Sequence, residues 1–142
     1  MIRVAWVVGG IGHGGVITVC RDVAEAVARD PEFKVTVVSP DPAHSEIRVP
    51  EGVELVVLNL PPERETASRG FLAWLAVHPQ DCVLFNDASY VEPAWAYVPA
   101  ETAVVVVLHD VASGWQSGVV RHRESLDAVI AVSGFVRNTL AG

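Results

Sequence analysis

Residues 7–19 read VVGGIGHGGVITV, so five glycines and one histidine lie between an apolar run and a run with helical apolar spacing. Glycine has no Cβ, so it permits positive φ angles and lets a ligand approach backbone N–H groups closely. A helix that begins just after such a loop presents free N–H groups and the positive end of its dipole to an anion. The stretch therefore predicts a strand, a ligand-binding loop and a helix.

The composition indicates one folded domain with a buried core. Of 142 residues, 51% are hydrophobic and 19% charged, which favours a sheet that is buried on both faces. The net charge of −7 and the absence of a Lys/Arg cluster argue against nucleic acid or an anionic membrane as the main partner. Cys20 and Cys82 have no metal-ligand spacing, so we expect no disulfide and no metal, and two small core residues.

The apolar segments are short. The start MIRVAWVVGG is too brief and too interrupted by glycine for a signal peptide, and the longest purely aliphatic run, 103–108, is far below a membrane span. These features predict a cytoplasmic protein without a transmembrane segment.

Short Val-rich runs alternate with longer amphipathic stretches, which is typical of parallel strands joined by crossover helices. We therefore predict an α/β fold, a Rossmann-like, doubly wound, mainly parallel six-stranded sheet with helices on both faces. The predicted strands are 3–8, 34–39, 53–58, 82–86, 103–109 and 127–133. Little polar alternation occurs within them, so we expect both faces of each strand to be buried.

Helices are predicted between the strands. The first follows the glycine loop, has an apolar stripe at Val16, Val19, Cys20, Val23 and Val27, and ends before Pro31. The second spans about 65–77 and buries Ala67, Phe71, Trp74 and Leu75. A short helix or turn within 89–99, a brief helix at 116–126 and a final helix capped by Ser133 complete the prediction.

Ligands of doubly wound sheets bind at the carboxyl ends of the strands. Four loops are nominated by this rule: 9–15, 86–90, 109–115 and 133–134. In the first, Gly10, Gly12 and Gly15 satisfy the pattern G-x-G-x-x-G, which predicts a dinucleotide site when an acidic residue closes the second strand. Here Asp41 is late and follows a proline. A phosphate cradle for a sugar nucleotide and a plain tight turn remain as alternatives.

Four stretches carry a resemblance to a known family: MIRVAWVVGG with HGGVITVCRDVAEAVARD, KVTVVSPD, AWAYVPAETAVVVVLHDV, and LDAVIAVSGFVRNTL. Taken in order, they resemble the N-terminal, acceptor-side Rossmann-like domain of a GT-B fold glycosyltransferase, most like the retaining GT4-type family. The segment between His109 and Asp127 is shorter than in that family.

The resemblance implies that residues 1–142 form one domain, the N-terminal half of such an enzyme. A C-terminal domain, absent from this chain, would bind most of the nucleotide. The complete enzyme would transfer a sugar from a nucleotide-diphosphate donor to a small-molecule or glycan acceptor, with retention and without a metal or other cofactor. This half alone is expected to be inactive.

The resemblance also implies roles for individual residues. Gly12, Gly14 and Gly15 would donate backbone N–H groups to the donor phosphate. His109 and Asp110 are the catalytic pair: His109 would orient the donor sugar, and Asp110 would act with it or only hold the His109 loop. The leaving phosphate would then take the acceptor proton. In inverting relatives a histidine in the first loop is the general base, and His13 is the candidate for that alternative. The expected acceptor-binding residues are Asn86, Asp87, Tyr90 and Trp115.

Each role has a structural alternative. His109 could only cap its strand, and residues 86–90 could form a turn with a surface tyrosine. Two other functions also fit the pattern: an NAD(P)-binding domain of an oxidoreductase, and a non-enzymatic α/β interaction module. Either a truncated enzyme or such a module would expose an apolar inter-domain face, through which self-association is expected.

Overall fold

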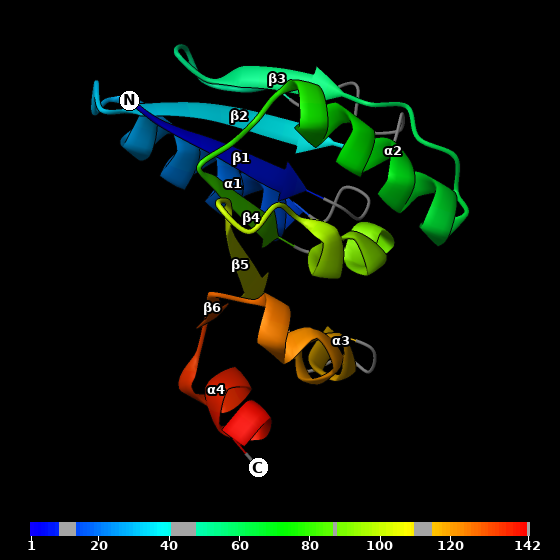
Figure 1. Ribbon diagram of the computed structural model, residues 1–142. Coiled ribbons are helices and arrows are strands. Elements are labelled where there is room, and N and C mark those ends of the chain that lie inside the picture. The colour runs from blue at the N-terminus through cyan, green and yellow to red at the C-terminus, as the bar shows by residue number, and fades with distance from the viewer. Residues whose placement is uncertain (9–13, 41–47, 87, 110–114, 142) are drawn as a thin grey trace.

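The computed structural model describes residues 1–8, 14–40, 48–86, 88–109 and 115–141, and it confirms the predicted sheet. Six parallel strands lie in the order β3-β2-β1-β4-β5-β6 (Figure 1). They are β1 (Ile2–Val8), β2 (Phe33–Ser39), β3 (Glu54–Val57), β4 (Cys82–Asn86), β5 (Ala103–Leu108) and β6 (Ala128–Ala131). The order reverses between β1 and β4, so the switch point of this doubly wound fold lies at the carboxyl ends of these two strands.

The helices lie on two sides of the sheet, as Figure 1 shows for α1 and α2. The helical segments are α1 (Gly14–Ala28), α2 (Arg64–Val77), η2 (Ser89–Tyr97), α3 (Trp115–His122), η3 (Arg123–Ser125) and α4 (Gly134–Ala141). The helix α1 packs over β1 and β2 in a small core that includes Trp6, Cys20 and Ala24. A larger core on the opposite face joins α2, η2, α3 and α4 to the strands.

The expected second helix and final helix are confirmed with small shifts of their ends. Ala67, Phe71 and Leu75 of α2 are buried, and Trp74 packs partly buried against the same core. The side chain of Ser133 accepts a hydrogen bond of 3.2 Å from the backbone N–H of Val136, which is the predicted cap of α4.

The expectation that both faces of every strand are buried is wrong at both edges of the sheet, since no residue of β3 is fully buried. The outer strand β6 is largely exposed, and Ile130 and Val132 are each about half accessible to water. On the face that carries α1, no helix in the described part of the chain covers β5 and β6. The apolar stripe of α1 is affected in the same way, because Val19 and Val23 face this uncovered area and are 47% and 40% exposed.

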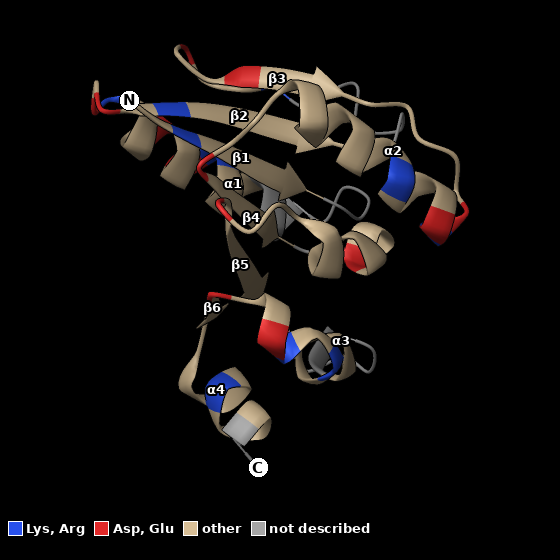
Figure 2. Cartoon of the chain, in the orientation of Figure 1, with Lys and Arg blue, Asp and Glu red and all other residues tan. Residues whose placement is uncertain are grey.

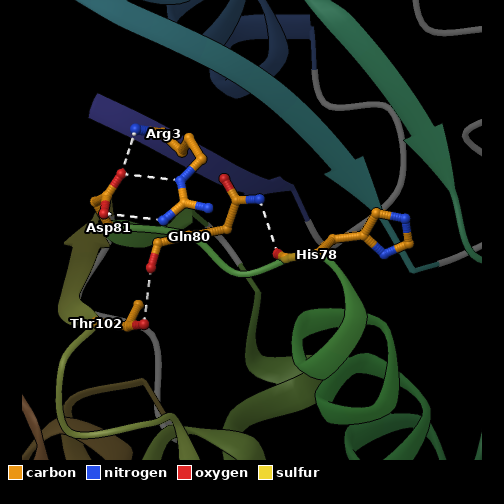
Figure 3. A network of polar contacts seen from close by, with 5 residues as sticks. All are labelled: Arg3, His78, Gln80, Asp81 and Thr102. Carbon is orange, nitrogen blue, oxygen red and sulfur yellow. Dashed lines mark hydrogen bonds and ion pairs between the residues drawn. The ribbon is translucent and has the colours of Figure 1, made fainter. Parts of the chain in front are cut away.

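At the amino ends of the strands, a polar network fixes how β1, β4 and β5 begin (Figure 3). The Asp81 carboxylate accepts hydrogen bonds from the backbone N–H of Arg3 at 2.7 Å and from its guanidinium at 3.1 and 3.2 Å. These contacts hold the pKa of Asp81 below its usual range. The Thr102 hydroxyl donates to the carbonyl of Gln80 at 2.8 Å. The Arg3–Asp81 pair therefore positions the strands at their amino ends, whereas the expected ligand site lies at their carboxyl ends.

Lys and Arg do not gather in one place among the described residues. Figure 2 shows them dispersed over β1, β2, α2, α3 and α4.

A buried carboxylate that sequence reasoning missed joins three helices. Glu92 of η2 is 5% exposed and accepts from Arg64 of α2 at 2.5 Å and from Arg121 and His122 of α3 at 2.9 and 3.0 Å. Gly118 leaves room for it, since a Cβ there would lie 3.1 Å from the Glu92 carboxylate. Glu92 thus clamps α2 and α3 to η2.

We expect Glu92→Gln to destabilise the fold by about 2 kcal/mol, the scale of hydrogen bonds to charged groups. Arg64 and Arg121 are about half exposed, so water can solvate them when the carboxylate is lost. The melting temperature should fall by about 5 °C in a calorimetric scan. Glu124→Gln is the control, because Glu124 is exposed on η3 and its replacement should change the melting temperature little. Equal melting temperatures of the two variants would contradict the clamp.

Candidate functional site

Strand register brings two of the predicted site residues together. Asn86, the last residue of β4, pairs with Val107 of β5. His109 follows Val107 by two residues, and side chains alternate across a strand, so both side chains point to the face that carries α1. The pair lies beside the switch point, where Val8 at the end of β1 pairs with Asn86.

A hydrogen bond fixes the state of the His109 ring. Its Nε2 lies 2.5 Å from the side-chain oxygen of Asn86. An amide oxygen only accepts, so Nε2 carries the proton and donates it. In the neutral ring Nδ1 is then the atom that can accept a hydrogen bond from a ligand hydroxyl.

Asn86 is unusual for a polar side chain in this fold. It is 1% exposed, and its Nδ2 has no hydrogen-bond partner. An unpaired buried amide costs about 1–3 kcal/mol. Asn86 therefore places a buried donor beside a histidine, at the edge where doubly wound folds bind ligands.

Burial lowers the pKa of His109 below its ordinary value, because desolvation disfavours the imidazolium. We therefore expect an NMR titration of the His109 ring protons to give a midpoint below about 6.5, the value of a free histidine. The lowered pKa favours the neutral ring, the form in which Nδ1 can accept a hydrogen bond from a hydroxyl.

The same shift predicts a pH dependence of stability. As the pH falls, His109 binds a proton in the unfolded chain before it does so in the folded one. Its contribution to the free energy of unfolding is therefore fully present above about pH 6.5 and is lost as the pH falls toward the lower pKa of the folded state. In urea titrations at pH 7 and pH 5, His109→Gln should lose less stability than the wild type. An equal loss in both proteins would contradict a depressed pKa.

The opening of α1 supplies the second half of the candidate site. Gly14 and Gly15 are its first residues, so their N–H groups belong to the first turn, which has no intrahelical acceptor. The first turn contains no acidic side chain, which would compete with an anionic ligand. The helix packs on the same face of the sheet to which Asn86 and His109 point.

The other predicted site residues are placed less completely. Gly12, His13, Asp87 and Asp110 lie outside the described residues. Trp115 is the first residue of α3, and its side chain is likewise outside the description.

The structure gives Tyr90 a packing role. Its hydroxyl donates to the carbonyl of Leu60 at 3.3 Å and also to that of Pro61, and its ring packs against the core on the face opposite α1. Acceptor binding by Tyr90 stays a prediction that these contacts do not support.

An apolar groove of about 460 Å³ begins at the Asn86–His109 pair. It runs along the α1 face toward the amino ends of the strands, reaching Ile2 and Phe33. Trp6, a buried member of the smaller core, lines it too.

No group of three His, Cys, Asp or Glu side chains among the described residues is arranged to hold a metal ion. None of the described helices combines the length and apolarity that crossing a membrane requires.

The comparisons with known proteins identify the fold. No protein-family model and no curated protein sequence matches the chain. Among solved structures, a putative UDP-N-acetylglucosamine 2-epimerase from Listeria monocytogenes matches 99% of this chain and 42% of its own, with a TM-score of 0.63 and 12% identity. A UGT transferase from Siraitia grosvenorii in complex with UDP matches 76% of this chain and 28% of its own, with a TM-score of 0.54 and 18% identity.

Both matches are to GT-B fold proteins, so the chain has the Rossmann-like fold of one part of such enzymes. It spans less than half the length of either structure. The resemblance to nucleotide-sugar enzymes is thereby supported at the level of the fold, and the finer GT4-type assignment stays a prediction.

Proposed function

We propose that this chain is the acceptor-side half of a glycosyltransferase that takes a nucleotide-diphosphate sugar as donor. The observation that carries the proposal is the buried Asn86–His109 pair at the switch point of a GT-B type domain. An apolar groove on the same face, lined in part by His109, supports the acceptor side.

The proposed mechanism assigns a task to each part. Glycosyl transfer builds negative charge on the departing diphosphate, and preorganised N–H donors stabilise such charge. Gly14 and Gly15 would supply them from the first turn of α1, with the helix dipole adding to the effect. With retention of configuration, the leaving phosphate takes the acceptor proton on the same face, so no protein carboxylate is required as base.

His109 acts in this scheme as a neutral acceptor. Its Nε2–H is committed to Asn86, so Nδ1 can receive a hydroxyl of the donor sugar and set its orientation. Asp110 and His13 keep the roles given by the resemblance, the first as support of the His109 loop and the second as the base of an inverting alternative.

The purified 142-residue chain should show no turnover. The nucleotide and the other wall of the cavity are assigned to a second domain, so this half lacks most donor contacts. Incubation with UDP-glucose or UDP-N-acetylglucosamine and a mixture of alcohols, followed by mass spectrometry, checks this. Sugar transfer by the chain alone would contradict the division of roles.

A nucleotide-sugar epimerase is the second candidate, because the epimerase match covers 99% of the chain and the transferase match 76%. Assays of the proposed two-domain enzyme separate the two candidates. An epimerase changes the sugar of UDP-N-acetylglucosamine at C2 without an acceptor, which NMR detects, whereas a transferase releases UDP and forms a glycoside only when an acceptor is present.

A further inference from the structure

A second pocket, of about 440 Å³, lies at the amino ends of the strands, away from the candidate site. Residues near the starts of β1, β2 and β3 line it, and Trp74 near the end of α2, with residues 78–80 that follow, completes the lining. The volume is within the range of small-molecule sites, 300–1,000 Å³. Neither Asn86 nor His109 lines this pocket, so it is a separate feature of the fold.

Strand register gathers three hydrogen-bond donors in this pocket. Arg3 of β1 pairs with Lys34 of β2, and Thr36 follows Lys34 by two residues, so the three side chains lie on one face of the sheet. This is the face that α2 covers, since Ala5, the next residue on that face of β1, belongs to the larger core. The Asp81 carboxylate takes Nε and Nη2 of Arg3, which leaves Nη1 without a hydrogen bond among the described residues (Figure 3).

Thr36 is the residue that most strongly indicates a ligand. It is 5% exposed, and its hydroxyl has no hydrogen-bond partner among the described residues. Trp6 Nε1 and Asn86 Nδ2 are sealed from solvent, whereas the Thr36 oxygen is not among the sealed atoms and opens to the pocket that the residue lines. Water reaches such a hydroxyl poorly, so a ligand oxygen would gain a hydrogen bond at a small desolvation cost.

The acidic and basic groups at the pocket come in pairs. Lys34 Nζ lies 3.6 Å from Glu54 Oε2, which is longer than a hydrogen bond, and both side chains are about half exposed. Arg3 is balanced by Asp81. Because the two cations and the two carboxylates cancel, a simple anion or cation finds no net charge to match. A molecule that carries both charges complements the loose Lys34–Glu54 pair.

The lining also has an apolar part. Val56 of β3 and Trp74 of α2 belong to it, and both side chains are partly buried. The Trp74 ring is held in place by stacking on His78, with the ring centroids 5.2 Å apart and the planes at 17°. An apolar or aromatic group in the pocket can pack against these two side chains.

We propose that this pocket binds a free α-amino acid with an apolar side chain. Lys34, the Thr36 hydroxyl and Arg3 Nη1 hold the carboxylate of the amino acid. Glu54 accepts hydrogen bonds from its ammonium group, and its side chain packs against the apolar part of the lining. The proposal goes beyond the proposed function and does not depend on it, since the pocket lies at the other end of the strands and on the other face of the sheet.

NMR titration of the ¹⁵N-labelled 142-residue chain with three related compounds tests the binding. L-phenylalanine carries both charges, 3-phenylpropanoate lacks the ammonium group, and 2-phenylethylamine lacks the carboxylate. Shifts of the Thr36 amide and of the Trp74 indole N–H report binding in the pocket. Phenylalanine should bind about tenfold more tightly than either analogue, because each analogue lacks one set of charged hydrogen bonds. Equal affinities of the three compounds, or no saturable shift at these two groups, overturn the proposal.

Variants assign each charge of the ligand to its partner. In Lys34→Gln, phenylalanine and 2-phenylethylamine should bind alike, since the carboxylate has lost its cation. In Glu54→Gln, phenylalanine and 3-phenylpropanoate should bind alike. Thr36→Val removes the hydroxyl and keeps the branched shape, and it should weaken phenylalanine about threefold. Circular dichroism verifies that each variant is folded.

The matched controls are Arg29→Gln and Glu25→Gln. These residues form an exposed ion pair on α1, on the other face of the sheet, so both variants should keep the affinities of the wild type. If the Lys34 and Glu54 variants keep the wild-type ratios among the three compounds, the pocket is not the site.

Glycine tests the apolar part of the proposal, because it carries both charges and no side chain. It should bind at least about threefold more weakly than phenylalanine, and equal affinity would contradict an apolar side chain in the pocket. No nucleotide or sugar enters any of these titrations, so failure here is distinct from failure of the proposed transferase.

Discussion

Replacing His109 by alanine in the proposed two-domain glycosyltransferase is expected to lower kcat/KM for sugar transfer about 10²- to 10³-fold, the loss typical of one positioned group at a transition state. The reason is the orientation of the ring. The side-chain oxygen of Asn86 lies 2.5 Å from Nε2 and accepts its hydrogen, which leaves Nδ1 for a substrate hydroxyl. Release of UDP measured against acceptor concentration gives the value.

Two further variants make this result specific. His78→Asn is the matched control, because His78 is exposed at the end of α2, where its Nδ1 lies 3.0 Å from the Trp74 carbonyl, and it should keep full activity. Asn86→Asp should depress activity less than His109→Ala but raise the pH at which activity falls on the acidic side, since a carboxylate stabilises the imidazolium. Wild-type activity in His109→Ala would remove His109 from the mechanism.

Phe85→Ala should destabilise the fold by about 3–5 kcal/mol, the cost of truncating a fully buried aromatic side chain. Phe85 is inaccessible to water. Its ring lies edge-on to Phe71, with the ring centroids 5.6 Å apart, and its centroid is 5.7 Å from that of Trp95. A urea titration at pH 7 measures the loss. A single domain of this size has only about 5–15 kcal/mol to lose, so the variant should be partly unfolded at 37 °C.

The matched control is Phe135→Ala. Phe135 is 68% exposed on α4, so its removal should change the free energy of unfolding by less than about 0.5 kcal/mol. Phe85 immediately precedes Asn86 and points to the opposite face of β4, so its packing also holds the strand that presents the site. Equal effects of the two alanine variants would mean that the large core is not centred on β4.

The sequence predicted the sheet because its signals are local. Short valine-rich runs between amphipathic stretches are read from neighbouring residues, and β4 has the predicted bounds. The prediction that every strand is buried on both faces failed at β6, because burial depends on which helices arrive above a strand, and no helix in the described part of the chain covers Ile130 on the α1 side.

The site was predicted residue by residue but not as an arrangement. Asn86 and His109 were both nominated, yet their hydrogen bond follows from the pairing of Asn86 with Val107, and a sequence contains no strand register. The clamp at Glu92 was missed for a related reason. Its partners lie 28 to 30 residues away in the chain, so no local pattern marks the glutamate as buried.

The central claim is that the opening of α1 and the Asn86–His109 pair form one site for a nucleotide sugar. Parallel NMR titrations of the ¹⁵N-labelled chain with UDP-glucose and with NADH test it most directly. The account predicts that millimolar UDP-glucose shifts the amides of Gly14 and Gly15 and the side-chain amide of Asn86, and that NADH gives no saturable shift. Saturable micromolar binding of NADH, or UDP-glucose shifts confined to other parts of the chain, would contradict it.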